Sequence, residues 1–282
     1  MTEHIDIYDG KIRLDAELAR PEETGEEGTL TSSSEASEPA GSPRPSGGRS
    51  GEKLPLCIII HGLTGDKDDA LPQAIERVVL SLGMASLRVD MFGHGKSDGT
   101  FFDHTLSKWF LNLLAIVDYA EKLDFVDGIY LCGHSQGGLT VMMGAAMLRD
   151  RIRGLIPIAP AWVIPDQVRE GTLLGHRFDG EKIPEELPLP DYELTLGGHY
   201  LREAQLIFVK EAVSRYDGPV LIVHGTEDEL VPYHFSEEIQ SCYRDVKLVP
   251  IPGDTHCFDY HVDQAAEVVK EWLGDDRTHR YL

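Results

Sequence analysis

Cysteine, basic charge and long apolar runs are all scarce in this sequence. Its four cysteines, Cys57, Cys132, Cys242 and Cys257, lie far apart or within apolar runs, and no CxxC pair occurs. We therefore expect reduced thiols without a role in disulfides or metal binding. No apolar run approaches the roughly 20 residues that span a bilayer. The N-terminus, MTEHIDIYDGK, lacks both regions of a secretory signal, so these absences predict a cytoplasmic protein.

The charge is strongly unbalanced. The chain has 48 acidic residues against 26 lysines and arginines, and its formal net charge is −22. Nucleic acids and anionic membrane surfaces attract basic patches, so this balance argues against both as partners. It identifies no substrate, because solubility alone explains it. The oligomeric state stays open, a homodimer included.

The first fifty residues divide into a hairpin and a polar insertion. His4–Tyr8 and Ile12–Leu18 alternate apolar and polar residues around Asp9-Gly10, which is typical of a β-hairpin. The next residues, 21–51, are rich in Glu, Ser, Gly, Pro and Thr, with Leu30 as the only large apolar residue. Such a segment buries too little surface to offset its ordering entropy, so we predict that it is disordered. It is an insertion within one domain, because the hairpin is too small to fold alone.

From Leu54 onward, short apolar runs alternate with amphipathic helical patterns. The predicted strands are Leu56–Ile60, Ala85–Val89, Ile129–Cys132, Gly154–Ile158, Val220–Val223 and Lys247–Ile251. The predicted helices are Leu71–Leu82, Leu106–Leu123, Leu139–Leu148, Phe235–Cys242 and Ala265–Leu273. This alternation predicts an α/β fold: a mostly parallel central sheet with helices on both faces and the hairpin as its antiparallel edge. About sixty residues separate the fourth and fifth strands, too many for a normal crossover, so we place a small inserted cap at about 161–217 of a single domain, 1–282.

Residues that carry chemistry follow the predicted strands. The loops read His61-Gly62-Leu63, Gly133-His134-Ser135-Gln136-Gly137, His224-Gly225-Thr226-Glu227-Asp228 and Pro252-Gly253-Asp254-Thr255-His256. Since the carboxyl ends of parallel strands meet at one edge of a sheet, Ser135, Asp228 and His256 should lie together. A G-x-S-x-G elbow followed by an acid and then a histidine is the arrangement of the α/β-hydrolase fold.

We predict a catalytic triad of Ser135, Asp228 and His256. A serine hydroxyl needs an imidazole to take its proton, and a carboxylate must orient that imidazole. His261, at the start of the final helix, is the alternative base, whereas His134 flanks the serine but points away from it.

The acid and the oxyanion donors follow from the same loops. Glu227 and Glu229 project to other sides of the turn than Asp228, and Asp254 is too close in sequence to the histidine. The oxyanion needs two N–H donors, for which we predict the backbone N–H groups of Gln136 and Leu63.

Two other motifs do not match the binding sites that they resemble. Gly95-Lys96-Ser97 resembles the end of a phosphate-binding loop, but Asp90 stands where that loop requires glycine. The remaining histidines do not have the spacing of zinc ligands. We expect neither a metal nor a cofactor.

Five stretches carry a closer resemblance: CIIIHGLTG, RVDMFGHGKSDG, GHSQGG, LIVHGTEDELVPY and IPGDTHCFDYH. They resemble the bacterial cinnamoyl (feruloyl) esterases from about Leu54 to Leu273. The resemblance implies the same triad and the same oxyanion donors. In that family the cap forms one wall of the phenolic acyl pocket, so the resemblance implies Tyr200 as a contact to the ring hydroxyl. The departures are the 21–51 insertion and the cap segment Leu187–Thr195.

These observations predict a serine carboxylesterase that hydrolyses hydroxycinnamate esters, small-molecule substrates, through an acyl-enzyme. The alternative is a short-chain acyl esterase or a monoacylglycerol lipase-like hydrolase. A non-catalytic binding module is disfavoured because it needs none of the three triad residues. The aromatic residues Trp162 and Tyr192 of the cap also suit contact with one face of a flat acyl group. Trp162 equally fits a structural role in attaching the cap to the domain.

Overall fold

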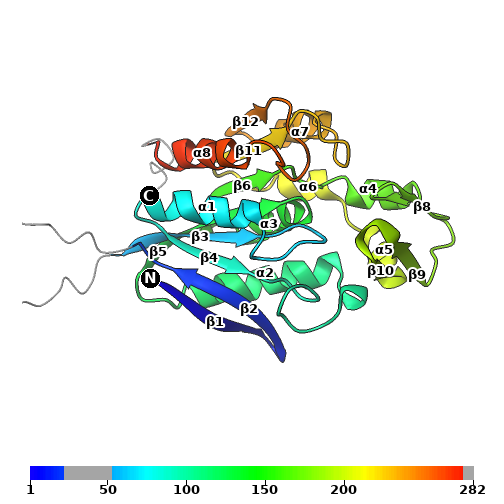
Figure 1. The fold of residues 1–282 in the computed structure, drawn as a ribbon, viewed down its shortest axis with the longest axis horizontal. Helices are drawn as coiled ribbons and strands as arrows, with labels where there is room; N and C mark the ends of the chain where they lie inside the picture. Colours follow the sequence, from blue (N-terminus) through cyan, green and yellow to red (C-terminus); the bar gives the residue numbers. More distant parts are fainter. Residues whose placement is uncertain (22–52, 276–282) are drawn as a thin grey trace, which may run out of the picture.

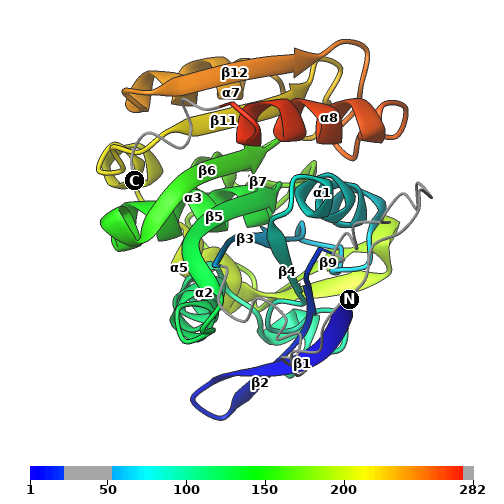
Figure 2. The same cartoon turned by 90° about the vertical axis from the view of Figure 1, so that its left-hand side faces the viewer.

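An eight-stranded sheet organises the computed structural model, which describes residues 1–21 and 53–275. The strand order is β1-β2-β4-β3-β5-β6-β11-β12 (Figures 1 and 2). The strands are β1 Thr2–Asp9, β2 Ile12–Ala19, β3 Leu54–Ile60, β4 Ala85–Val89, β5 Val126–His134, β6 Ile152–Ile158, β11 Val220–Gly225 and β12 Val246–Ile251. From β4 to β12 every pairing is parallel, whereas β2 pairs antiparallel with β1 and β4. The predicted mostly parallel sheet with an antiparallel edge hairpin is confirmed.

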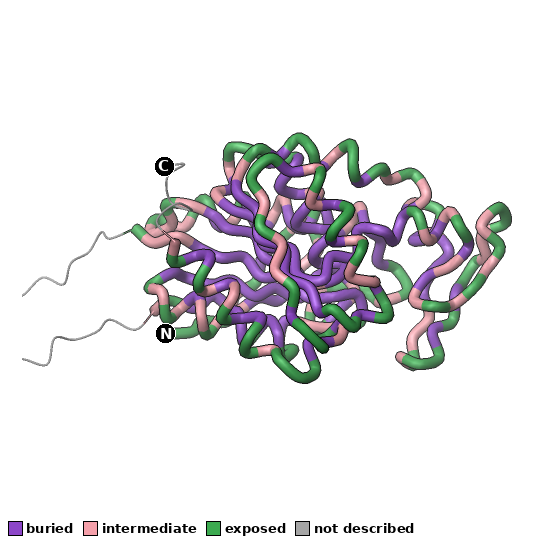
Figure 3. Tube along the Cα trace, turned by 90° about the horizontal axis from the view of Figure 1, so that it is seen from above, coloured by how far each residue is buried: buried purple, intermediate pink, exposed green. Residues whose placement is uncertain are grey.

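Helices cover both faces of this sheet. They are α1 Ala70–Ser81, α2 Leu106–Ala120, α3 Gln136–Leu148, α7 His234–Ile239, followed by the short helix η4 Gln240–Cys242, and α8 Val262–Leu273. Helices α1 and α8 bury Ile59 and Tyr130 on one face, and α2 and α3 bury Ile58 and Leu131 on the other. Successive residues of a strand point to opposite faces, so a strand covered on both sides is apolar along its whole length. Figure 3 shows the resulting buried centre.

Most of the cap segment, residues 161–217, lies beyond the carboxyl ends of the parallel strands, at the right of Figure 1. Its last residues run back past α3 to the start of β6, where the Tyr216 hydroxyl donates to the Ile152 carbonyl oxygen. Its elements are α4 Ile164–Arg169, β7 Thr172–Leu173, β8 His176–Arg177, β9 Glu186–Leu189, η3 Pro190–Tyr192, β10 Leu194–Gly197, α5 Gly198–Ala204 and α6 Val209–Val213. Buried side chains such as Leu189, Leu196 and Leu201 join it to the main apolar cluster of the domain. The cap segment is therefore packed against the site edge of the sheet.

The chain leaves the described part after Pro21 and returns at Lys53. Ala19 at the end of β2 pairs with Ser86, which pairs in turn with Cys57 near the start of β3. Both points therefore lie at the edge of the sheet opposite the cap segment. Apart from Pro21, the predicted disordered insertion lies outside the described residues. Within the ranges that the structure describes, no helix combines the length and apolarity needed to cross a membrane.

Candidate active site

Ser135 occupies a strained turn between β5 and α3. Its backbone has φ 54° and ψ −119°, a region that a residue with a side chain rarely adopts. A Cβ on Gly133 would lie 2.3 Å from the Gly137 carbonyl oxygen, and one on Gly137 would lie 2.3 Å from the His61 carbonyl oxygen. Only glycine fits at these two positions. The Ser135 N–H donates to the Ile158 carbonyl oxygen over 2.9 Å, which ties the elbow to the neighbouring strand.

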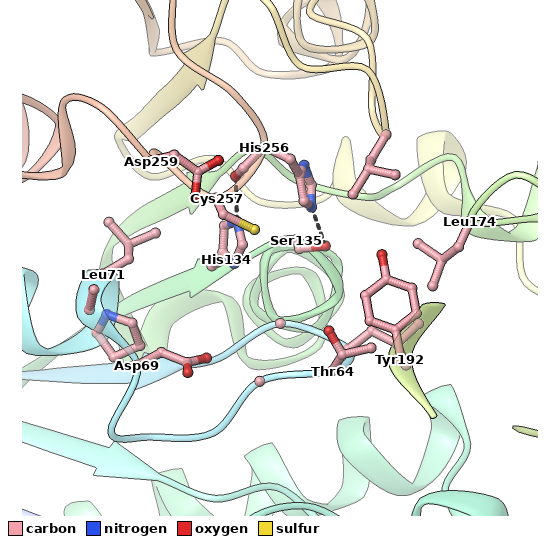
Figure 4. Close-up of a pocket in the computed structure, with 16 residues that line it drawn as sticks. Thr64, Asp69, Leu71, His134, Ser135, Leu174, Tyr192, His256, Cys257 and Asp259 are labelled. Carbon is pink, nitrogen blue, oxygen red and sulfur yellow. Dashed lines mark hydrogen bonds between the residues drawn. The ribbon is translucent and has the colours of Figure 1, made fainter. Parts of the chain in front are cut away.

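The structure brings the three predicted triad residues together. The Ser135 hydroxyl lies 2.8 Å from His256 Nε2 (Figure 4), and His256 Nδ1 lies 2.6 Å from Asp228 Oδ2. Each of the three is less than a tenth exposed. With Nδ1–H donated to the carboxylate, the Nε2 lone pair faces the serine hydroxyl. This is the arrangement that general-base activation of a serine requires.

Asp228 is held in its ionised form. Its Oδ1 accepts the backbone N–H groups of Leu230 and Val231 over 2.9 and 2.8 Å, and its Oδ2 accepts from both His256 and His224. Burial by itself raises the pKa of this carboxyl, but the hydrogen bonds from His224 and His256 outweigh burial and hold the pKa well below its ordinary value. A permanent carboxylate therefore stands behind the imidazole.

Sequence reasoning missed the role of His224. Its Nδ1 accepts the Ser236 hydroxyl over 2.6 Å, so the ring proton sits on Nε2. That Nε2–H lies 2.9 Å from both Asp228 Oδ2 and the Val231 carbonyl oxygen. The histidine fixes the orientation of the carboxylate. Its only sequence signal is its place at the end of β11, four residues before the aspartate.

The peptide between Gly62 and Leu63 is oriented by a buried histidine. Burial lowers the pKa of His61 well below its ordinary value, so the ring is neutral. The Met91 N–H donates to His61 Nε2 over 3.0 Å, and His61 Nδ1–H donates to the Gly62 carbonyl oxygen over 2.7 Å. In a planar trans peptide the N–H points opposite to the carbonyl, so the Leu63 N–H faces away from His61.

That orientation suits an oxyanion hole. Leu63 lines the cavity beside Ser135. Gln136 is the first residue of α3, where backbone N–H groups have no partner within the helix. One predicted donor therefore belongs to the loop after β3, and the other to the first turn of α3, next to Ser135.

The cavity over Ser135 has a volume of about 360 Å³ and extends to both sides of this serine. On the cap side lie Thr64, Leu174 and Tyr192 (Figure 4). The other side, here called the α1 side, is lined by residues at the start of α1 and on the His256 loop: Asp69, Leu71, Cys257 and Asp259 (Figure 4).

The remaining histidines of these loops have other partners. His134 Nε2–H donates to the His256 carbonyl oxygen over 2.8 Å, and burial lowers the pKa of His134 to about 3. His261 precedes α8 with a side chain 45% exposed, and its Nδ1 lies 3.5 Å from Asp254 Oδ2. Asp254 itself accepts the backbone N–H groups of Thr255, Tyr260 and His261, which shapes the loop that carries His256. The alternative base is therefore turned away from the serine.

Two predicted substrate contacts need correction. Tyr200 is fully buried, and its hydroxyl donates to Gln136 Oε1 over 2.6 Å instead of facing the cavity. Trp162 is 2% exposed, and its Nε1–H donates to the Phe235 carbonyl oxygen over 2.9 Å, which joins the start of the cap segment to α7. Among these cap aromatics, Tyr192 is the one that lines the cavity. The polar atoms of Tyr200 and Trp162 are thus already engaged in hydrogen bonds within the protein.

Comparison with known proteins places these features in context. The family described as Hydrolase_4, serine aminopeptidase S33, matches residues 51–195. The solved structure of Est1E from Butyrivibrio proteoclasticus with ferulic acid bound is 48% identical, covers 95% of this chain and 97% of that chain, and superposes with a TM-score of 0.84. The bifunctional esterase/perhydrolase DCH of Acinetobacter calcoaceticus is 25% identical and covers 72% of this chain and 85% of that protein.

Another curated relative is longer than its matched region. The mitochondrial palmitoyl-protein thioesterase ABHD10 of Homo sapiens is 29% identical over 204 residues, which are 66% of this chain. The match covers 61% of that protein, so the chain spans about three fifths of the length of this relative.

Ser135→Ala is expected to lower kcat by on the order of a million-fold, because it leaves His256 without a hydroxyl to activate. A fluorophosphonate probe should label the wild-type enzyme and leave the variant unlabelled. His256→Ala should be about as damaging, whereas the matched control His261→Ala should retain activity. Labelling of Ser135→Ala, or an inactive His261→Ala beside an active His256→Ala, would contradict this assignment.

Tyr200→Phe is expected to lower the free energy of unfolding by about 0.5–1.5 kcal/mol, since it removes one neutral hydrogen bond to the side chain of Gln136, and to change the rate by the same factor on every ester. Steady-state rates on methyl ferulate, methyl cinnamate and p-nitrophenyl acetate provide the measurement, with the exposed Tyr260→Phe as control. Methyl ferulate carries a ring hydroxyl that methyl cinnamate lacks. A loss confined to methyl ferulate would therefore show that Tyr200 contacts the substrate.

Proposed function

The chain belongs to the Hydrolase_4 family of serine hydrolases, and from that premise we propose that it is a carboxylesterase that hydrolyses hydroxycinnamate esters. The resemblance of its motifs to bacterial feruloyl esterases is confirmed. A Ser-His-Asp site can cleave amides or esters, so the substrate class needs its own support. The observation that carries it is the 48% identical structure that holds ferulic acid and aligns with 95% of this chain.

The geometry supports a two-step reaction through an acyl-enzyme. His256 Nε2 takes the proton of the Ser135 hydroxyl as its oxygen attacks the ester carbonyl carbon. Asp228 stabilises the imidazolium that forms, and the N–H groups of Leu63 and Gln136 stabilise the tetrahedral oxyanion. His256 then gives its proton to the departing alcohol. A water molecule, activated by the same imidazole, attacks the acyl-enzyme and releases the acid and the free serine.

The cap side of the cavity suits a flat aromatic acyl group. Tyr192 presents its ring and hydroxyl there, with Leu174 and Thr64 on the same side of Ser135 (Figure 4). Aromatic rings stack or meet edge to face, and a neighbouring hydroxyl gives a phenolic ring a polar partner. We therefore assign the hydroxycinnamoyl group to this side, with Tyr192 in the contact that the sequence suggested for Tyr200.

A small-molecule ester is the substrate. We treat the chain as one domain, in which the cap segment closes the acyl side of the cavity. We also keep the cytoplasm as the proposed location: all four cysteines lie in the described part of the chain and are free, which fits a reducing compartment.

An ester screen tests the proposal directly. Methyl ferulate, chlorogenate and p-nitrophenyl esters of graded chain length should be compared side by side by kcat/KM. We expect methyl ferulate to exceed the aliphatic p-nitrophenyl esters once the intrinsic reactivity of each ester is allowed for. Good turnover of aliphatic esters beside poor turnover of every cinnamate would overturn the proposal and favour a short-chain esterase or monoacylglycerol lipase-like hydrolase.

Tyr192→Ala is expected to lower kcat/KM for methyl ferulate about 2- to 13-fold through the lost aromatic contact. The acetyl group of p-nitrophenyl acetate is too short to reach the cap side, so its kcat/KM should change less than about 2-fold. Tyr8→Ala, at an exposed tyrosine on β1, is the matched control. Equal losses on both esters would place the ring of the acyl group elsewhere.

A further inference from the structure

The α1 side of the cavity is acidic, in contrast to the cap side. Asp69 and Asp259 both line it, from two segments that are far apart in the sequence. Figure 4 shows them on the flank of Ser135 away from Tyr192, with Cys257 and Leu71 between or beside them. Two carboxylates thus border the part of the cavity into which one half of a bound ester extends from Ser135.

Asp69 stands at a helix N-terminus but does not cap the helix. It precedes α1 as the N-cap residue, yet its side chain makes no capping hydrogen bond. The third residue of the helix is Pro72, which has no N–H to donate, so the usual capping partner is missing. The carboxylate instead accepts the Asp66 N–H through Oδ2, over 3.0 Å, and projects into the cavity (Figure 4).

The electrostatic surroundings of Asp69 favour an incoming cation. Burial raises the pKa of Asp69 above its ordinary value, and the nearby charges of Asp66, Asp90 and Asp68 raise it further. The backbone hydrogen bond from Asp66 offsets only part of this. Among the residues that the structure describes, no lysine, arginine or histidine forms an ion pair with Asp69. Neighbouring positive charge therefore does not balance the negative charge of the Asp69 carboxylate.

Asp259 faces the same space. Its Oδ2 accepts the Thr255 hydroxyl over 2.5 Å, and within 1–21 and 53–275 it too forms no ion pair. The thiol of Cys257 responds to both acids: burial raises its pKa, and the charges of Asp259, Asp228 and Asp69 raise it further. The two carboxylates therefore add to one negative potential inside the cavity, beside the nucleophile.

We propose that Asp69 and Asp259 form the alcohol subsite and select esters whose alcohol part carries a positive charge. This rests on the proposed function, which assigns the acyl group to the cap side. The acyl and alcohol parts diverge from the ester carbonyl carbon, so an acyl group beside Tyr192 leaves the alcohol on the α1 side. A cationic alcohol there gains Coulomb attraction to both carboxylates, whereas an anionic alcohol is repelled by them.

The expected effect is modest because both aspartates are accessible to water at the mouth of the cavity, although neighbouring groups enclose part of Asp69. Each carboxylate should change the preference for a cationic over a neutral alcohol about 1.5- to 5-fold, as exposed ion pairs do. Raising the salt concentration should weaken the preference, since the Debye length falls from about 30 Å at 0.01 M to about 3 Å at 1 M.

Two pairs of esters that differ in alcohol charge test the proposal. The first compares feruloylcholine with 3,3-dimethylbutyl ferulate, its uncharged isostere. The second compares chlorogenate, whose alcohol is anionic, with its methyl ester. The measured quantity is the ratio of kcat/KM within each pair, for the wild type, Asp69→Asn, Asp259→Asn and the double variant, at low and high salt.

The control variant is Asp150→Asn. Asp150 is exposed on the short helix Arg149–Arg151, which precedes β6 and so lies at the opposite edge of the sheet from Ser135. The Asp150→Asn substitution removes one negative charge at a position that does not line the cavity. Its ratios should equal those of the wild type, which separates a local effect from the overall charge of the protein.

We expect the wild type to prefer the choline ester over its isostere and methyl chlorogenate over chlorogenate, with both preferences reduced in each variant and most in the double variant. Ratios near one in the wild type, or ratios that the double variant leaves unchanged, would overturn the subsite. Failure of the proposed function has a different signature, because none of the four ferulate or caffeate esters would then be hydrolysed well while aliphatic esters were.

Discussion

The active site depends on one steric constraint, the close packing of backbone around the strained Ser135. The serine can keep its left-handed conformation because glycine lets three segments approach without side chains: Gly133 lies against Gly137, and Gly137 lies against the His61 carbonyl. The Ser135 carbonyl oxygen then accepts the Ala161 N–H over 3.0 Å, at the start of the cap segment. The turn at Ser135, the loop after β3 and the start of the cap segment therefore meet through neighbouring backbone contacts. A bulkier residue at either glycine would displace all three.

Buried histidines complete the site without acting as bases. His61 and His94 have pKa values lowered by burial, which keeps their rings neutral. His61 holds the Gly62 carbonyl, and His94 Nε2 contacts the Leu63 carbonyl on the next peptide. Further along the same loop, the Lys67 N–H donates to Asp90 Oδ1 over 2.7 Å. The loop for which we propose an oxyanion donor is therefore held in place by hydrogen bonds within the protein, as electrostatic preorganisation requires.

Specificity is divided between the two sides of the nucleophile. The cap side offers an aromatic and apolar surface around Tyr192, and the α1 side offers the carboxylates of Asp69 and Asp259. The two surfaces come from different parts of the chain, so the acyl and alcohol preferences of this esterase can change separately. Tyr200 connects the cap segment to the catalytic turn indirectly, because its hydroxyl joins helix α5 of the cap segment to Gln136, the residue after Ser135.

The sequence alone determined the sheet, its hairpin edge and the chain order of Ser135, Asp228 and His256, because strand alternation and the glycines of the elbow are local patterns. It predicted His256 as the base, with His261 as the alternative, and it suggested Tyr200 for a contact that we propose for Tyr192. These outcomes depend on packing between distant segments. The cap aromatics all suit an apolar pocket by residue type, and only the fold of a cap made of short elements decides which hydroxyl meets a protein acceptor and which faces the cavity. The pairing of His224 with Asp228 and the place of Asp69 beside the His256 loop were likewise decided by tertiary structure, since neither follows from any periodicity along the chain.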